Sequence, residues 1–304
     1  SDFVKQSGCY NSFEGDASWV ILTPIEQSIK QKIEAVGTPL KDWDINIYRG
    51  VLTGCNEAFI ISTEKRDEIL ANCQTEDERK RTEELIRPIL RGRDIKRYGY
   101  NWAGLWLIAT FPSRHYDIEK YPTVKNYLLS FGKERLEQTG KVHVINGERI
   151  KARKKTNNKW FETQDSISYW EDFSKPKVVY PNMTKYMPFV YDEKSLLTNQ
   201  KCFIITGENV AYLTAFLNSS LFKFCFRDCF PELLGGTREL SKIFFDKIPV
   251  KKVTSEKEAI FSSLVNELQK SYDEQKAKEI DNLIFDIYTI DENERKEIGY
   301  IEIQ

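Results

Sequence analysis

The spacing of apolar residues changes at Ser255, and this change limits the fold more than any other feature of the chain. After it, apolar residues recur every three or four positions in two stripes, 260–272 and 280–288, which predicts two amphipathic helices. Before it, short apolar runs such as 105–111 and 201–206 are separated by polar turns, a pattern typical of strands. We therefore expect an α+β fold, with a mixed-sheet body flanked by helices and a C-terminal helical tail.

Local signals divide the chain further. Thr23 and Pro24 are typical of the start of a helix, and Gly37 is typical of a helix end. The polar stretch 140–165 is expected to form either a hairpin or an extended loop, and 240–250 is expected to leave the body as a strand. The predicted units are an N-terminal helical connector, 1–40; a recognition body, 41–250; and a C-terminal helical segment, 251–304.

The charge of the chain is unevenly distributed. The formal net charge is −1, but residues 251–304 hold 8 Lys and Arg against 13 Asp and Glu, whereas residues 1–250 hold 37 against 33. An acidic tail thus masks a mildly basic body, a distribution compatible with a nucleic-acid partner for the body.

The six cysteines indicate the cellular compartment. They fit no disulfide framework and no zinc-ligand spacing, so we expect free thiols in a reducing cytoplasm. The chain has neither a secretory signal nor a run of the roughly 20 apolar residues that a membrane span needs. Because it begins with Ser1, we expect it to be a piece cut from a longer bacterial protein. The cysteines are Cys9, Cys55, Cys73, Cys202, Cys225 and Cys229.

Motifs for catalysis are missing from the sequence. It has no Gly-x-Gly turn of the kind that binds nucleotides or S-adenosylmethionine, and no Asn-Pro-Pro-aromatic loop. Asp192-Glu193-Lys194 matches half of a metal-dependent nuclease motif, a match that chance often produces in a chain with 30% charged residues. His115 and His143 have no partner nucleophile motif. We therefore predict no catalytic, cofactor-binding or metal-binding residue in this chain.

Residues 149–161 form the strongest candidate binding segment. Its cations would attract phosphates, its asparagines could pair with an adenine edge, and an arginine could pair with guanine. Trp160 and Phe161 would anchor the segment to the core, and a solvated hairpin is the alternative. The predicted DNA-binding residues here are Arg149, Lys151, Arg153, Lys154, Lys155, Asn157, Asn158 and Lys159.

Two further segments are candidates for phosphate contact. In 86–98, five cations face only Asp94, and the predicted contacts are Arg91, Arg93 and Lys96. A turn closed by ion pairs with Asp94 is the alternative there. Thr237 and Arg238 follow a Gly-Gly turn and could bind one or two phosphates. For the turn Thr53-Gly54-Cys55-Asn56, a structural role is favoured over DNA contact.

Several blocks of the sequence resemble one protein family. GVLTGCNEAFIIS at 50–62 and LIRPILRGRDIKRY at 85–98 are followed by WLIAT, YPTVKNYL, KPKVVYPNM and FIIT. GGTRELSKIFFDKIPV and a helical terminal block at 279–298 come last. In this order the blocks resemble the TaqI-like C-terminal specificity region of Eco57I-like type IIG restriction enzymes, which are also adenine-specific DNA methyltransferases.

This resemblance implies a division of labour. The chain would recognise a double-stranded DNA sequence and would direct adenine-N6 methylation, cleavage or both by upstream domains of the parent protein. Those domains, its other expected partners, would use S-adenosylmethionine and, where a nuclease is present, Mg²⁺. Three alternatives remain open: half of a type I specificity subunit, a protein-interaction module with an acidic partner, and an undetected nuclease that uses Asp192 and Lys194.

Overall fold

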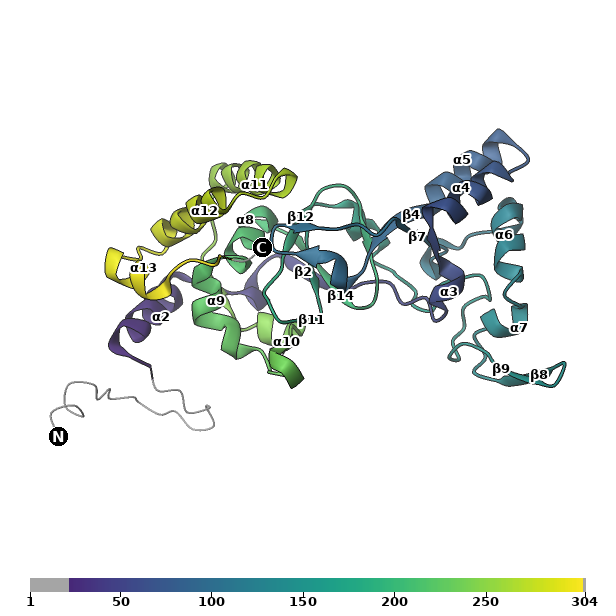
Figure 1. The fold of residues 1–304 in the computed structure, drawn as a ribbon, viewed down its shortest axis with the longest axis horizontal. Coiled ribbons are helices and arrows are strands. Elements are labelled where there is room, and N and C mark those ends of the chain that lie inside the picture. The colour runs from purple at the N-terminus through teal and green to yellow at the C-terminus, as the bar shows by residue number, and fades with distance from the viewer. Residues whose placement is uncertain (1–21, 303–304) are drawn as a thin grey trace.

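The computed structural model describes residues 22–302, which form an elongated molecule with two hydrophobic cores. Figure 1 shows α2 (Pro24–Val36) and the C-terminal helices at one end, and hairpin β8–β9 (Val142–Ile145 and Glu148–Lys151) at the other. A four-stranded sheet lies between the two ends. Helices and mixed sheets occur together, so the predicted α+β class is confirmed.

The central sheet is antiparallel and has the strand order β12-β10-β14-β2. Along β10, Val178 and Tyr180 belong to the first core and Val179 to the second, because successive side chains of a strand point to opposite faces. Both faces are therefore covered, which explains why 178–181 is a continuous apolar run. The strands are β2 (Ile45–Arg49), β10 (Lys177–Pro181), β12 (Val190–Asp192) and β14 (Cys202–Gly207).

Helices cover the first-core face of this sheet, and α8 is buried along its whole length. Both α11 and α12 pack on α8, and the buried residues Phe261, Val265 and Ile284 lie on the two predicted stripes. The predicted helical tail is therefore confirmed. Among residues 22–302, no helix is long and apolar enough to cross a membrane. The helices at this end are α8 (Val210–Leu217), α9 (Ser220–Phe226), α11 (Ser255–Lys270), α12 (Glu274–Ile287) and α13 (Glu292–Ile298).

The two ends of the described chain are joined in this first core. Helix α2 begins with the predicted Thr23 cap, and Lys32 on it forms an ion pair with Glu294 of α13, with 2.6 Å between Nζ and Oε2. Thr38 pairs with Val250 in a short antiparallel ladder. The first core thus combines side chains from all three predicted units.

The second core lies under a mixed sheet of order β13-β4-β7-β3, in which only the β13–β4 pair is parallel. The polar stretch 140–165 contains a hairpin, one of its two predicted forms. The sheet consists of β3 (Ile60–Ser62), β4 (Ile86–Leu90), β7 (Leu105–Ile108) and β13 (Leu197–Thr198). The surrounding helices are α3 (Asn56–Phe59), α4 (Thr63–Ala71), α5 (Glu76–Leu85), α6 (Pro122–Leu129) and α7 (Lys133–Leu136).

The predicted strand at 240–250 is wrong. One helical turn, α10 (Lys242–Phe245), precedes the short strand β16 (Pro249–Val250). The turn buries Phe245 beside Tyr180, with ring centroids 5.0 Å apart, and leaves Ile243 exposed. The remaining two-residue strands are β1 (Thr38–Pro39), paired with β16; β5 (Ile95–Lys96), with β6 (Gly99–Tyr100); and β11 (Met183–Thr184), with β15 (Arg238–Glu239).

The described cysteines are free thiols, as predicted. Cys202 is buried in the second core, whereas Cys229 is exposed, so not all of them are buried. Cys9 lies outside the described residues.

An ion pair is buried in the central sheet. Lys177 on β10 and Asp192 on β12 are directly paired residues, and 2.6 Å separates Nζ from Oδ2. The ammonium also donates to the Phe173 carbonyl, and the carboxylate accepts the amides of Lys194 and Leu196. Burial lowers the pKa of Lys177. Removing one partner of such a buried pair leaves an uncompensated charge in the interior.

We expect Asp192→Ala to lower the free energy of unfolding by about 3–5 kcal/mol, because it leaves the Lys177 ammonium buried without its counter-ion. Urea denaturation followed by circular dichroism would measure this. Lys194→Ala, at an exposed neighbour, is the control and should change stability by less than about 0.5 kcal/mol. Equal stability of Asp192→Ala and the wild type would contradict a structural role for the pair.

Candidate nucleic-acid interface

Hairpin β8–β9 projects from the end of the molecule that carries the second core (Figure 1). Asn146 and Gly147 form its two-residue turn with φ of 52° and 82°, which suits a type I′ hairpin. Arg149 and Lys151 on β9 are exposed and lie opposite exposed valines of β8. A two-stranded ribbon of this kind fits the width of a DNA major groove.

Arg153, a predicted base-contacting residue, is instead buried. Its side chain lies beneath the loop that follows the hairpin, and only 5% of the residue is exposed. Its guanidinium donates to four main-chain carbonyls at 2.6–2.8 Å, those of Thr53, Leu136, Trp160 and Glu162. Burial lowers the pKa of Arg153 to about 10. The prediction of DNA contact is corrected here: Arg153 organises the loop, because its donors satisfy carbonyls that no strand or helix pairs.

The other candidates of this loop divide into exposed and fixed residues. Lys154, Lys155 and Asn157 are exposed, and so is Lys159. Asn158 is half-buried, and its amide donates to the Gln164 carbonyl at 2.8 Å. Asn157 is therefore better placed than Asn158 to contact a base edge.

The basic segment 86–98 also contains both exposed cations and cations fixed by bonds within the protein. Arg91 pairs with Asp94 at 2.7 Å, and this hydrogen bond raises the pKa of Arg91. The structure thus shows the alternative for this segment, a turn closed by an ion pair with Asp94. The Arg91 side chain remains 26% exposed, so its phosphate contact stays a prediction. Arg97 is buried. Arg93 and Lys96 remain exposed.

The Gly-Gly turn also differs from its prediction. Gly235 and Gly236 both have positive φ, as a tight turn requires. Arg238 folds back under the turn, where it donates to the Phe230 carbonyl at 2.9 Å and pairs with two carboxylates. Because this guanidinium is already neutralised and 11% exposed, its predicted phosphate contact is corrected. Thr237 is half-buried beside it.

The central sheet brings three polar residues together at one of its ends. Strand β2 ends at Arg49, β14 begins just after Lys201, and β10 is followed by Asn182. The antiparallel register places these positions side by side. Arg49 Nε donates to the Gln200 carbonyl at 3.0 Å, and the Asn182 amide donates to the Lys201 carbonyl at 2.8 Å.

The Arg93 turn lies against this sheet end. A Cβ on Gly92 would come 3.2 Å from the Lys201 carbonyl oxygen and 3.3 Å from the Pro181 Cβ, so the close approach favours glycine at this position. Arg93, Asn182 and Lys201 line one cavity of about 420 Å³. Strand β11, which also lines it, pairs with β15 and so brings the Gly-Gly turn to the same surface.

Arg49 connects this cavity with the basic loop. The half-buried carboxyl of Asp165 lies near both Arg49 and Lys154; burial raises its pKa, and the two cations oppose the rise. The ring of Tyr169, whose hydroxyl donates to the Arg49 carbonyl, stacks on Tyr48 at 4.3 Å between centroids. We call the resulting surface the basic band. It comprises Lys154, Arg49, Lys201 and Arg93.

None of the four cations of the basic band forms an ion pair within residues 22–302. Sequence analysis missed Arg49 and Lys201. Neither lies in a basic run, and only the strand register places them next to the predicted cations.

The turn at Thr53 is structural, as favoured. Thr53 is buried and donates through Oγ1 to Asn56 Oδ1 at 2.7 Å, and Gly54 has a φ of 75°. A Cβ on Gly54 would come 2.9 Å from the side chain of Arg153. The turn therefore supports the loop that carries Lys154.

The residues considered for catalysis lie apart. Asp192 is held in the ion pair with Lys177, and Lys194 is exposed. His115 is exposed, and His143 is half-buried on β8. In the part of the chain that the structure describes, no three His, Cys, Asp or Glu side chains are arranged to hold a metal ion.

Comparisons with known proteins identify a family and a fold for this chain. The family model of the TaqI-like C-terminal specificity domain matches residues 87–250. The type IIG restriction endonuclease BpuSI is 13% identical, with a TM-score of 0.50 over 88% of this chain and 34% of that one. The type IIL restriction-modification enzyme MmeI, solved in complex with DNA, is 10% identical, with a TM-score of 0.54 over 86% and 36%. At these identities the likeness concerns the fold, and this chain spans about a third of either structure's length.

We expect Arg153→Ala to lower the free energy of unfolding by about 2–4 kcal/mol, because the buried carbonyls that it satisfies lose their donors. Urea denaturation would measure the loss. Lys154→Ala, the exposed neighbour, is the control and should change stability by less than about 0.5 kcal/mol. If the two substitutions proved equally mild, Arg153 would not organise the loop.

Proposed function

Because the chain belongs to the family of TaqI-like C-terminal specificity domains, we propose that it recognises the double-stranded DNA sequence on which a restriction-modification enzyme acts. One observation carries the proposal: Arg93 and Lys201, distant in sequence, line one cavity, and Arg49 donates to the residue next to Lys201, so that cations without an ion pair among the described residues gather at one end of the sheet. A surface of this kind attracts the phosphate backbone of a duplex without reference to sequence.

The contacts divide between phosphates and bases. We assign phosphate contact to the four cations of the basic band, together with Lys151 at the end of the hairpin and Lys155 in the loop that follows it. Arg149, Lys159, Lys96 and Thr237 flank this surface and would add to it. Asn157 is the candidate for base recognition, since it is exposed and an asparagine can pair with adenine through two hydrogen bonds.

Catalysis would reside in other domains of the parent protein. We propose that these domains methylate adenine N6 with S-adenosylmethionine, and that a nuclease, where present, uses Mg²⁺. They are the second partner of this chain. The acidic helices α11, α12 and α13 lie at the opposite end from the hairpin (Figure 1). Their charge opposes DNA contact, which leaves that end for docking on the catalytic domains.

The double variant Lys154→Glu plus Lys155→Glu tests the phosphate contacts. We expect duplex affinity to fall at least tenfold, and the slope of log K against log salt to become shallower by about 2, because each lost phosphate contact removes about 0.9. Fluorescence anisotropy of a labelled duplex between about 50 and 200 mM salt would measure both.

The matched control is Lys257→Glu plus Lys270→Glu, which makes the same charge change at exposed positions of α11. It should leave the slope unchanged. Weak duplex binding by the wild type at low salt, or equal binding by both double variants, would reject the proposed function.

Asn157→Ala tests base recognition separately. We expect affinity for unrelated duplexes to stay within about twofold, whereas discrimination at one base pair falls by about 1–3 kcal/mol. Selection from a randomised duplex library by the wild-type and variant chains would show which position loses its preference. Asn158→Ala should instead weaken all sequences alike, because its amide holds the loop. An unchanged consensus for Asn157→Ala would remove Asn157 from base recognition.

A further inference from the structure

Segment 182–188 lines the cavity of the basic band and also a second basic cavity. The second cavity has a volume of about 400 Å³ and is enclosed by this segment, by α9 and by the residues that follow α13. Its one carboxylate is that of Glu302. Four cations and two tyrosines line it: Arg97, Lys185, Lys223, Arg227, Tyr186 and Tyr300.

Arg97 contributes an incompletely bonded guanidinium to this cavity. The residue is 4% exposed; its Nε donates to the Asn218 carbonyl at 3.0 Å and its Nη1 to the Tyr272 hydroxyl at 3.1 Å. Its Nη2 has no hydrogen-bond partner among the described residues. Such orphaned buried donors are rare in proteins, and a bound water or ion is one of the explanations for them.

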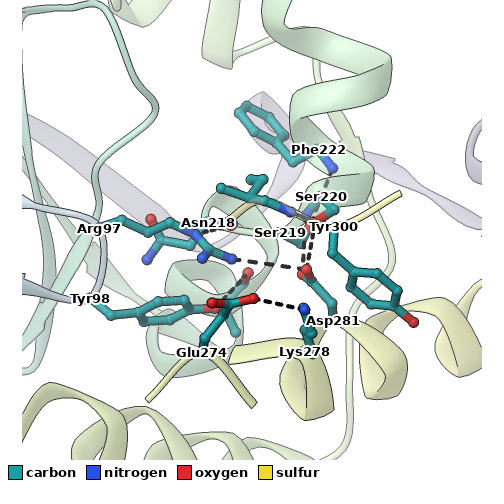
Figure 2. A network of polar contacts seen from close by, with 12 residues as sticks. Arg97, Tyr98, Asn218, Ser219, Ser220, Phe222, Glu274, Lys278, Asp281 and Tyr300 are labelled. Atoms are coloured by element: carbon teal, nitrogen blue, oxygen red, sulfur yellow. Dashed lines mark hydrogen bonds and ion pairs between the residues drawn. The ribbon is translucent and has the colours of Figure 1, made fainter. Parts of the chain in front are cut away.

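The nearest counter-charge is the carboxylate of Asp281, which is hydrogen-bonded to Ser220 and not to Arg97. Figure 2 shows the Arg97 guanidinium facing Asp281, but 3.9 Å separates Nη2 from Oδ2. The Asp281 carboxylate accepts the amide and the hydroxyl of Ser220 at 3.0 and 2.5 Å. Burial also raises the pKa of Asp281. The charge of Arg97 is therefore left without a hydrogen-bonded anion.

The three remaining cations strengthen this imbalance. Lys185, Lys223 and Arg227 form no ion pair within residues 22–302, and Lys185 and Lys223 are exposed. Tyr186 is 60% and Tyr300 37% exposed, so both rings lie at the rim. An anion inside the cavity could thus carry a flat group toward the tyrosines.

We propose that this cavity binds a phosphate ester attached to a ring, that is, a nucleotide. The phosphate would accept from Lys223 and Arg227, because an ammonium and a guanidinium present the donors that phosphate oxygens accept. The buried Arg97 would add its positive charge from the cavity wall, and the base would lie against the exposed ring of Tyr186. The nucleotide could be a free molecule or part of a DNA strand that extends past the basic band.

Adenosine monophosphate is the probe, with inorganic phosphate and adenosine as its two halves. Isothermal titration should show saturable binding of the monophosphate, weaker binding of phosphate and none of adenosine. The double variant Lys223→Gln plus Arg227→Gln should lower the affinity for adenosine monophosphate at least about tenfold, because two charge-assisted contacts are lost. The control is Lys247→Gln plus Lys270→Gln, at exposed positions away from the cavity. It should leave the affinity for adenosine monophosphate unchanged.

The absence of saturable binding up to about 10 mM, a weak affinity even for a small ligand, would overturn the proposal. So would equal affinity of the two double variants. If a short duplex displaces the monophosphate, the proposal holds and the DNA backbone is the source; if both bind together, it holds for a free nucleotide. Because the titration itself contains no DNA, its outcome is independent of the proposed recognition function.

Discussion

The burial of β10 on both faces is the constraint on which the rest of the molecule depends. Val178 and Tyr180 belong to one core and Val179 to the other, so a shift of register by one residue would exchange the two cores. The same strand carries Lys177, whose ion pair with Asp192 fixes β12 against it. Register also decides what lies at the sheet end, since it sets Arg49 and the residues around Lys201 next to each other. The candidate DNA surface is therefore a consequence of core packing.

Three of the arginines predicted to contact DNA have a different task from the lysines. The guanidinium groups of Arg91, Arg153 and Arg238 turn inward and bind carbonyls or carboxylates. Lys154 and its lysine neighbours stay in solvent. The physical reason is the number of donors: a guanidinium has five in one plane and can satisfy several carbonyls of an irregular loop, whereas an ammonium is a strongly hydrated point charge. Charge counts along a sequence treat both alike and so overestimate the free positive charge of a loop.

Periodicity predicted α11 and α12 well because burial on one side repeats along a helix. The start of α2 was predicted from its cap, and β10 and β14 were predicted from their apolar runs. Periodicity failed at α10, where a single turn is too short to show a period and the burial of Phe245 decides the conformation. The site was predicted less completely. Lys154 and Arg93 lie in basic runs, but Arg49 joins them only through tertiary contacts that leave no local pattern. The burial of Arg153 depends on carbonyls as distant in sequence as that of Thr53.

The two basic cavities share one wall, segment 182–188. Asn182 and Thr184 line the cavity of the basic band, whereas Lys185 and Tyr186 line the cavity around Arg97. An anion bound in one cavity would act across the segment on the other to the extent that screening allows, over roughly 8–10 Å at physiological salt. Phosphates at the two positions therefore oppose each other electrostatically unless they belong to one strand whose backbone spaces them. The two surfaces are thus expected to respond to each other's ligands, and more strongly at low salt than at high salt.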